Sequence, residues 1–385
     1  MTPAHRQLGG AALVCVALGA IPAGAQSIFD GELRLAPQFQ SYHIASPQNE
    51  TISQFAIPVF VTLPFGSRFS MDVGTSYTRA RLSSDNGVSE INGLTDTQVR
   101  GNATLGSDAV VLTLGLNFPT GRESATLEQF AAASRIGSDF LAFPISNMGT
   151  GFGATGGVAV AQTVGDWSLG VGAALRRSQS YEPFNIPNQT LVFQPGNEYR
   201  LRVGGDRPVG PGRLALGLTY SAFAKDDAGG YRYSTGDRVI TQAVYSRPVS
   251  GVETVMGVYD VYRLNGTYAS GAPAGQENIA NGFVSASFHP QGVALVEPSL
   301  ELRHWRQHVG TPDLNTGLID WRSQGSFLAT VGVRTRLDLA GVTAYPSVGF
   351  TAGTLATTDA GGVPTHAGLT GFRAQIAMRA APFAP

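Results

Sequence analysis

Charge and cysteine are both scarce in this chain of 385 residues. Charged residues make up 14% of it, against roughly 25% in typical soluble domains, and Lys225 is the only lysine. The single cysteine, Cys15, excludes disulfide frameworks and thiolate metal sites. The formal net charge of −1 argues against nucleic acid as a partner. These absences disfavour an ordinary soluble enzyme and a nucleic-acid-binding protein.

Long hydrophobic runs are also missing. The run from Leu8 to Ala20 has about 13 residues, whereas a membrane-spanning helix needs roughly 20. It follows the basic start His5-Arg6 and precedes Ala23 and Ala25, which fit an A-x-A cleavage site. We therefore predict a signal peptide over residues 1–25, and an exported mature chain over residues 26–385.

The mature chain shows apolar residues at every second position. Such alternation predicts β-strands that have one apolar face. In one example the apolar residues alternate with Thr113, Gly115 and Asn117. These apolar residues are Val110, Leu112, Leu114, Leu116 and Phe118. Similar stretches recur from Phe55 to Met378, and no comparable pattern has the period of a helix.

Short turns and longer polar connections separate these stretches. Seven short turns are predicted, at Pro64–Ser67, Gly106–Asp108, Gly165–Asp166, Pro208–Gly212, Pro248–Gly251, Pro290–Gly292 and Leu339–Gly341. Longer connections are predicted at Ser83–Asn92, Asp226–Gly230, Gly266–Gln276 and Gly310–Asp320. Adding terminal strands at Phe29–Ile44 and Ala367–Met378 gives about sixteen strands, as in an antiparallel outer-membrane barrel. Fourteen is the alternative, with the first strand inside the lumen.

The apolar face could meet either a dry core or lipid. In a soluble sandwich it faces the core, whereas in a membrane barrel it faces lipid and the small or polar set faces the lumen. The many strands, and an opposite face rich in glycine, serine, threonine and arginine, favour the transmembrane β-barrel. A β-helix or a multi-sandwich adhesin is the alternative fold.

A family resemblance supports this interpretation. The segment Gly115–Gly121, a strand that runs into Pro-Thr-Gly, resembles one common in outer-membrane transporters of apolar and aromatic compounds. The overall plan, with a leader, an even strand number and a long third loop, is similar to general porins. The resemblance implies an outer-membrane location and a transport function.

The longest connection, Thr120 to about Thr150, is the third extracellular loop in this count. Thr120 and Glu123 have capping-box spacing, which predicts a short helix with Leu127, Phe130, Ala131 and Ser134 on one face. A loop this apolar indicates a contact surface, either in the barrel mouth or against another subunit of a homo-oligomer. It acts as a constriction or hydrophobic guide, or only as a stabilising plug. The residues predicted for a constriction are Glu123, Glu128, Phe130, Asp139, Phe140 and Phe143.

Arginine dominates the predicted inner wall. A basic wall that faces an acidic loop sets up a field that biases ion selectivity. The alternative is that these arginines pair with neighbouring acids and only hold the wall together. The residues predicted to line the pore are Arg100, Arg200, Arg202, Arg334 and Arg336.

Two motifs are set aside. Gly151–Gly156 matches G-x-G-x-x-G. A dinucleotide site requires a strand before this motif and a helix after it, and the sequence predicts neither here. Glu301, His304, His308 and Asp313 do not supply three converging ligands on a strand, as a metal would need. We interpret His304, Trp305 and His308 as residues of the membrane interface, where amphipathic rings settle. We expect no catalytic residues, metal or cofactor, and therefore no enzyme.

The pattern predicts an outer-membrane pore or passive transporter for small solutes, including hydrophobic or aromatic compounds. The alternative is a surface-exposed structural or adhesive barrel without transport. The expected partners are outer-membrane lipid and a small-molecule or ionic cargo.

Overall fold

The computed structural model describes residues 31–45, 49–106, 109–289, 295–312, 319–339, 341–358 and 364–380. The predicted signal peptide, the Pro290–Gly292 turn and Asp313 lie outside these ranges. In the described residues, no helix has the length and apolar character needed to cross a membrane.

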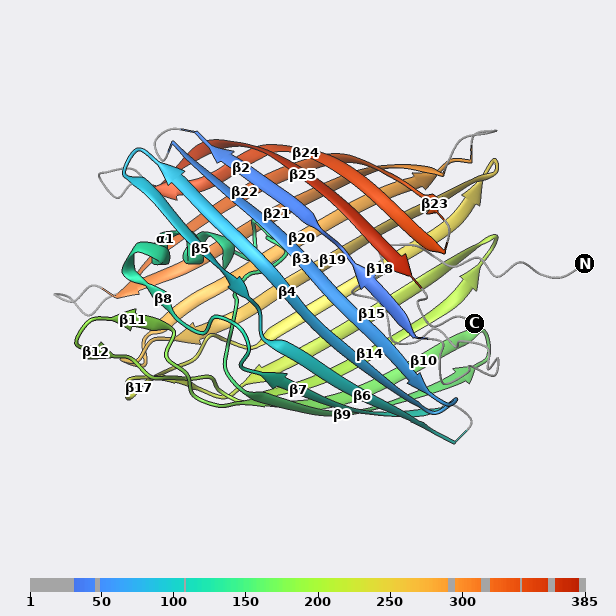
Figure 1. The fold of residues 1–385 in the computed structure, drawn as a ribbon, viewed down its shortest axis with the longest axis horizontal. Helices are drawn as coiled ribbons and strands as arrows, with labels where there is room; N and C mark the ends of the chain where they lie inside the picture. Colours follow the sequence, from blue (N-terminus) through green and yellow to red (C-terminus); the bar gives the residue numbers. More distant parts are fainter. Residues whose placement is uncertain are drawn as a thin grey trace, which may run out of the picture.

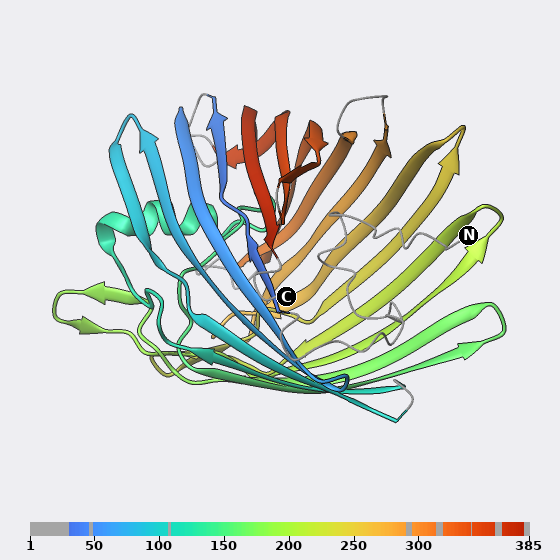
Figure 2. The same ribbon diagram turned by 45° about the vertical axis from the view of Figure 1, so that its right-hand side comes forward.

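Sixteen antiparallel strands form one closed wall (Figures 1 and 2). Three of them are interrupted and carry two labels each, because the pairing breaks at residues 36–37, 95–96 and 336. The interrupted strands are β1 and β2 (Glu32–Leu35, Gln38–Ile44), β5 and β6 (Gly87–Leu94, Thr97–Leu105), and β22 and β23 (Ile319–Thr335, Leu337–Leu339). The others are β3 (Glu50–Phe65), β4 (Phe69–Ser84), β7 (Val110–Phe118), β9 (Gly153–Val164), β10 (Trp167–Ser178), β14 (Glu198–Val209), β15 (Gly212–Phe223), β18 (Arg238–Val249), β19 (Val252–Thr267), β20 (Pro273–Ser287), β21 (Val296–Pro312), β24 (Val342–Thr358) and β25 (Pro364–Ala380).

The first and last strands close the ring. Phe39 of β2 is paired with Phe55 of β3 on one side and with Ala374 of β25 on the other. The first strand is therefore part of the wall, which confirms the count of sixteen and shows that the fourteen-strand alternative is wrong.

The strands are joined by short turns at one end and mostly by longer connections at the other (Figure 1). Glycine permits the tightest turns, because Gly165 and Gly210 have φ of +59° and +57°, which glycine adopts without steric cost. The long connection predicted at Ser83–Asn92 is wrong. The alternation of β4 and β5 continues there as a hairpin with Ser84 paired to Gly87.

One helix and several short strands lie at the end of the barrel that carries the longer connections. The third connection, residues 119–152, carries helix α1 (Leu127–Ile136), as predicted, and the two-residue strand β8 (Ala125–Thr126). Strand β8 joins β11 (Phe184–Ile186) and β12 (Gln189–Thr190) in a small sheet. A second small sheet contains β13 (Phe193–Gln194), β16 (Asp226–Ala228) and β17 (Tyr231–Tyr233).

The outer surface of the wall is an apolar belt. Leu216 and Leu218 of β15 are 42% and 47% exposed, and Val331 of β22 and Phe350 of β24 are 62% and 65% exposed. So much exposed apolar surface on a closed ring of strands fits hydrocarbon rather than water. The chain is a transmembrane β-barrel. A single-chain barrel of this design belongs in an outer membrane, so the long connections are taken as extracellular.

The buried core lies between the third loop and the inner face of the wall. Its members come from the loop and from strands on two sides of the closure, and are Tyr42, Ile44, Ile52, Ala80, Leu82, Ile91, Ala125, Ala132, Ile136, Phe140, Leu141, Phe143, Met148, Leu328, Leu355, Ala367 and Leu369. The core thus holds the third loop against the inner face of the wall.

Candidate functional site

The two ends of the third loop, residues 117–121 and 148–150, lie side by side and are held together by Asp96. We call this junction the neck of the loop. Asp96 lies at the break between β5 and β6 and is only 6% exposed. Its carboxylate accepts hydrogen bonds from the backbone N–H of Gly121 (3.1 Å) and Thr150 (2.7 Å), and from Asn117 Nδ2 (2.8 Å). Its own N–H donates to the carbonyl of Met148 at 3.0 Å. One side chain therefore joins the start and the end of the loop.

The Pro-Thr-Gly segment is part of this neck. Thr120 Oγ1 accepts the backbone N–H of Thr97 at 2.8 Å and lies 2.7 Å from the Thr97 hydroxyl. A Cβ atom on Gly121 would lie 2.5 Å from the Asp96 nitrogen, closer than real Cβ contacts. The segment therefore has a local structural role, with glycine needed where two chain segments touch.

Helix α1 packs on the wall through a face other than the predicted one. Ala132 and Ile136 are buried, whereas Leu127 and Phe130 are 66% and 49% exposed. The predicted capping box is also wrong, because the helix begins six residues later, where Gln129 Oε1 accepts the Thr126 N–H at 3.2 Å.

Polar wall residues hold the helix in this orientation. Ser89 of β5 donates to the carbonyl of Glu128 at 2.5 Å and accepts the N–H of Ala132 at 3.2 Å. Arg135 pairs with Glu50 of β3 at 2.6 Å. These contacts select the face of the helix that meets the wall.

The tip of the loop, Phe140–Phe143, is clamped from both sides of the barrel closure. Gln40 of β2 donates to the carbonyl of Leu141 at 3.1 Å, and Arg303 of β21 donates to that of Phe140 at 2.8 Å. The ring of Phe140 lies 6.0 Å from Trp305, and Phe143 lies 5.5 Å from Tyr42. The side chains of Phe140 and Phe143 therefore pack against the wall and do not project into the lumen.

Trp305 consequently points into the barrel, and its prediction as a membrane-interface residue is wrong. His304 and His308 occupy the alternate positions and face outward. The ring of His308 stacks on that of Trp321, with 4.7 Å between the ring centroids. The difference follows from the period of two along β21.

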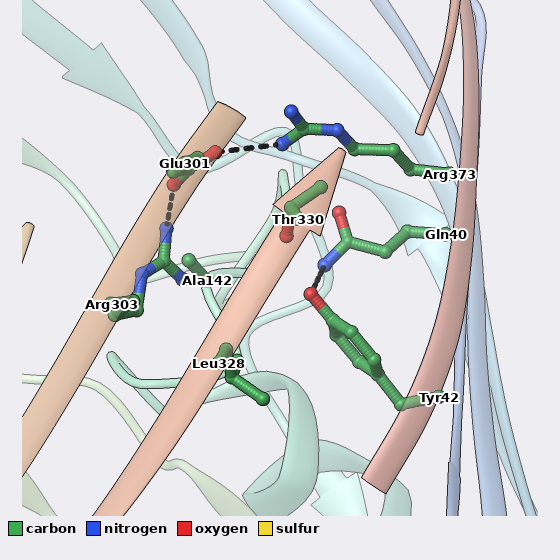
Figure 3. A pocket seen from close by; sticks show the side chains of 8 residues that line it. All are labelled: Gln40, Tyr42, Ala142, Glu301, Arg303, Leu328, Thr330 and Arg373. Carbon is green, nitrogen blue, oxygen red and sulfur yellow. Dashed lines mark hydrogen bonds and ion pairs between the residues drawn. The ribbon is translucent and has the colours of Figure 1, made fainter. Parts of the chain in front are cut away.

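A small polar pocket adjoins the tip (Figure 3). Glu301 accepts hydrogen bonds from Arg303 at 2.9 Å and from Arg373 at 3.2 Å. Gln40 Nε2 donates to the hydroxyl of Tyr42 at 3.0 Å. Ala142 borders this pocket with φ of +47°, a strained conformation for alanine. The wall contacts on both sides hold the backbone in this strained turn.

The acidic residues of the loop lie far apart. Asp139 reaches across to Arg263 of β19 at 3.0 Å. Glu123 borders a separate extracellular pocket beside Glu182 and Phe184, and the ring of Phe130 lies 5.5 Å from that of Phe184. Of the predicted constriction residues, the structure brings only Asp139, Phe140 and Phe143 together at the inner wall.

Four of the five predicted pore-lining arginines have acidic partners. Arg100 pairs with Asp72 at 2.7 Å and Arg200 with Glu198 at 2.6 Å. Arg334 pairs with Glu297 at 2.5 Å and Arg336 with Asp338 at 3.1 Å. For these four, the interpretation as wall-bracing pairs has direct support. Within the described ranges, no ion pair involves Arg202.

These pairs nevertheless face open space inside the ring. Alternation places Arg100, Arg200 and Arg213 on the inner face, opposite the apolar belt. Their side chains are 60%, 51% and 57% exposed. Neighbouring inward positions are small, including Gly204 and Gly217, which are paired with each other. The wall from β6 to β15 therefore keeps solvent-accessible charge within the barrel.

Sequence reasoning missed Asp96, Gln40 and Gln54. Gln54 of β3 makes two hydrogen bonds to the backbone of Ile145, at 2.7 and 3.0 Å. The two glutamines are polar residues at inward positions. Many other residues of the wall have the same character, so the pattern does not single them out. Within the part of the chain that the structure describes, no group of three potential ligands could hold a metal ion.

Comparisons with known proteins give likeness of fold at low identity. No family model matches the chain, and the comparison with curated proteins found no match. OpdQ of Pseudomonas aeruginosa is 7% identical with a TM-score of 0.45, covering 91% of this chain and 98% of its own. The anion-selective porin of Comamonas acidovorans is 14% identical with a TM-score of 0.40, covering 91% and 98%. An outer membrane channel from Pseudomonas putida F1 is 12% identical with a TM-score of 0.38, covering 94% and 97%. At these scores the likeness carries no argument about function.

Proposed function

We propose that the protein is a passive pore in the outer membrane, through which small solutes diffuse. The observation that carries this proposal is the exposure of inward-facing charge. Arg100, Arg200 and Arg213 remain more than half exposed on the inner wall, although each has an acidic partner. A lumen packed with side chains would bury them.

The path we infer runs between the third loop and the arc β9–β15. The loop tip is held on β2, β3, β19 and β21 by Gln40, Gln54, Arg263 and Arg303. The facing arc carries glycine at several inward positions together with Arg176, Arg200 and Arg202. This arrangement narrows the lumen from one side and leaves the basic side open.

The inferred selectivity is a mild preference for anions. Paired arginines contribute little net field, so the preference depends on those without a partner. Within the described residues neither Arg176 nor Arg202 makes an ion pair. Their charge acts on solutes in a water-filled lumen at short range, because salt screens beyond about 8 Å at physiological ionic strength.

A hydrophobic or aromatic cargo is a finer proposal. Leu127 and Phe130 of α1, which are 66% and 49% exposed, support it. Phe140 and Phe143, which were predicted from the sequence as constriction residues, are 3% and 6% exposed and face the wall. They lend the proposal no support.

Planar-bilayer recording tests the pore and its selectivity together. The purified protein is expected to conduct, with a reversal potential in a KCl gradient that shows mild anion preference. Arg202→Gln should reduce this preference. Arg207→Gln is the matched control, because Arg207 lies on the same strand, faces outward and loses the same charge.

Each outcome has a clear meaning. A silent barrel would contradict the pore and favour a structural or adhesive surface protein. Cation preference in the unaltered protein, or equal effects of the two substitutions, would overturn the role given to Arg202.

A further inference from the structure

A basic cluster lies on the outer face of the wall, in the extracellular half of β21. It consists of His304 and Arg306 of β21 and His366 of β25. Their neighbours in sequence fix their direction, since Arg303 contacts the third loop inside the barrel and Ala367 is 1% exposed in the inner core. Alternation then turns the three basic residues outward. They therefore lie outside the lumen and take no part in the proposed pore.

The three side chains surround a position that has no side chain. Gly325 of β22 is the register partner of Arg306. His366 Nε2 lies 3.1 Å from the carbonyl oxygen of Gly325. A Cβ atom on Gly325 would lie 3.9 Å from His304 Nε2. Side chains from two strands, β21 and β25, thus converge on the bare backbone of a third, β22, at Gly325.

The positive charge of this cluster is available to an external ligand. Arg306 is exposed, and it makes no ion pair with any residue that the structure describes. Its partner on β20, Asn278, donates to Asp260 of β19 at 2.6 Å. On this side of β21, the first outward carboxylate by register among the described residues is that of Asp260, one strand beyond Asn278, and it is already hydrogen-bonded.

Apolar surface continues directly below the cluster. On β21, Leu300 and Leu302 are 39% and 42% exposed, and Phe327 and Val331 on β22 are 42% and 62% exposed. On the other side, the stacked pair of His308 and Trp321 has the amphipathic character of residues at the membrane–water boundary. The cluster therefore lies where lipid headgroups meet acyl chains.

We propose that this cluster binds the phosphate of a phosphorylated lipid in the outer leaflet. The guanidinium of Arg306 offers paired N–H donors to phosphate oxygens, and the imidazole of His304 can add an N–H donor beside it. His366 is held in place by the Gly325 carbonyl. The apolar surface below accepts the acyl chains. The combination of a fixed cation and adjoining hydrocarbon-facing surface fits an amphiphile better than a soluble anion.

Lipid retention in detergent tests the site. The barrel is titrated with bisphosphorylated lipid A, with the dephosphorylated form and with inorganic phosphate, and bound species are counted by native mass spectrometry. The bisphosphorylated form should bind more tightly than the dephosphorylated one. Arg306→Gln should weaken its binding about tenfold, as expected for one lost charge-assisted contact, and Arg306→Lys should restore part of it.

Arg81→Gln is the control, because Arg81 faces outward at the extracellular end of β4, on a different part of the wall. It should leave lipid binding unchanged. Equal loss in the two variants, or equal binding of the dephosphorylated lipid, would overturn the proposal. Displacement of the lipid by an equal concentration of inorganic phosphate would show that a soluble anion is the ligand.

Two further readouts separate this site from folding and from transport. Both variants should keep the heat-dependent mobility shift of a folded barrel on an SDS gel. The bilayer conductance of Arg306→Gln should equal that of the unaltered protein, because the residue lies outside the ring. Changed conductance would contradict its outward placement.

Discussion

Asp96 couples two chain segments that are distant in sequence. It is buried, and every hydrogen bond to its carboxylate comes from a donor at the neck of the third loop. Removing this buried acceptor would leave its three donors unsatisfied, at a cost of about 1–3 kcal/mol for each buried group. The junction between the two ends of the loop therefore depends on this one residue.

Gly121→Ala tests how tightly this neck is built. The added Cβ would lie 2.5 Å from the Asp96 nitrogen and 2.6 Å from the Thr95 carbonyl carbon, so the backbone must move. We expect a loss of about 1–3 kcal/mol, in the range of overpacked sites. Faster hydrogen exchange across residues 119–152 would report it.

Gly156→Ala is the control for that change. No atom lies within 4 Å of a Cβ at Gly156, so exchange in the loop should stay as it is. If both alanines behaved alike, the close approach at Gly121 would have no role in holding the loop.

The role of Asp96 could not be predicted from local pattern. Its partners lie at positions 117, 121 and 150, and only the folded loop brings them to one carboxylate. Glycine at 121 was visible in the Pro-Thr-Gly segment, but the sequence gives no sign of what approaches it.

At the scale of elements, the third loop is stabilised from its tip as well as its neck. Leu141 is 1% exposed, and the carbonyls beside it are held by Gln40 and Arg303. Apolar burial and backbone hydrogen bonds act together there, whereas the opposite face of α1 remains in solvent.

Leu141→Ala and Leu127→Ala make the contrast measurable. The first removes a buried side chain and should cost about 2–5 kcal/mol of loop stability. The second removes one that is 66% exposed and should change stability by no more than about 0.5 kcal/mol. Protease cleavage within residues 119–152 should rise only for Leu141→Ala. Cleavage that rises equally for both would show that the tip does not anchor the loop.

Wall strands were predictable because a period of two is imposed by each strand's own backbone. The stretch from Val110 to Phe118 shows it, with its apolar residues outward and Thr113 and Asn117 inward. The contact face of α1 was not predictable, because Ser89 and Glu50 of distant strands select it. The hydroxyl and carboxylate that hold the helix are ordinary inward polar residues in the sequence.

At the scale of the whole molecule, two solvents meet opposite faces of one sheet. Apolar side chains cover the outside, and glycine with paired charge covers the inside. Because outward and inward residues alternate along a strand, two neighbouring residues of β15 should face different surroundings, one lipid and the other water. Leu218 faces outward and is 47% exposed, while Thr219 is paired with Arg202 on the inner wall.

Leu218→Arg and Thr219→Arg test this orientation with one charge placed one residue apart. On the lipid face, arginine near the bilayer midplane should cost about 2–4 kcal/mol, which would lower the unfolding midpoint of the barrel in lipid vesicles. On the lumen face it should fold normally and strengthen the anion preference in bilayer recordings. Reversed sensitivities, with Thr219→Arg the damaging change, would mean that the apolar face does not meet lipid. The membrane assignment would then fail, and with it the pore and the lipid site.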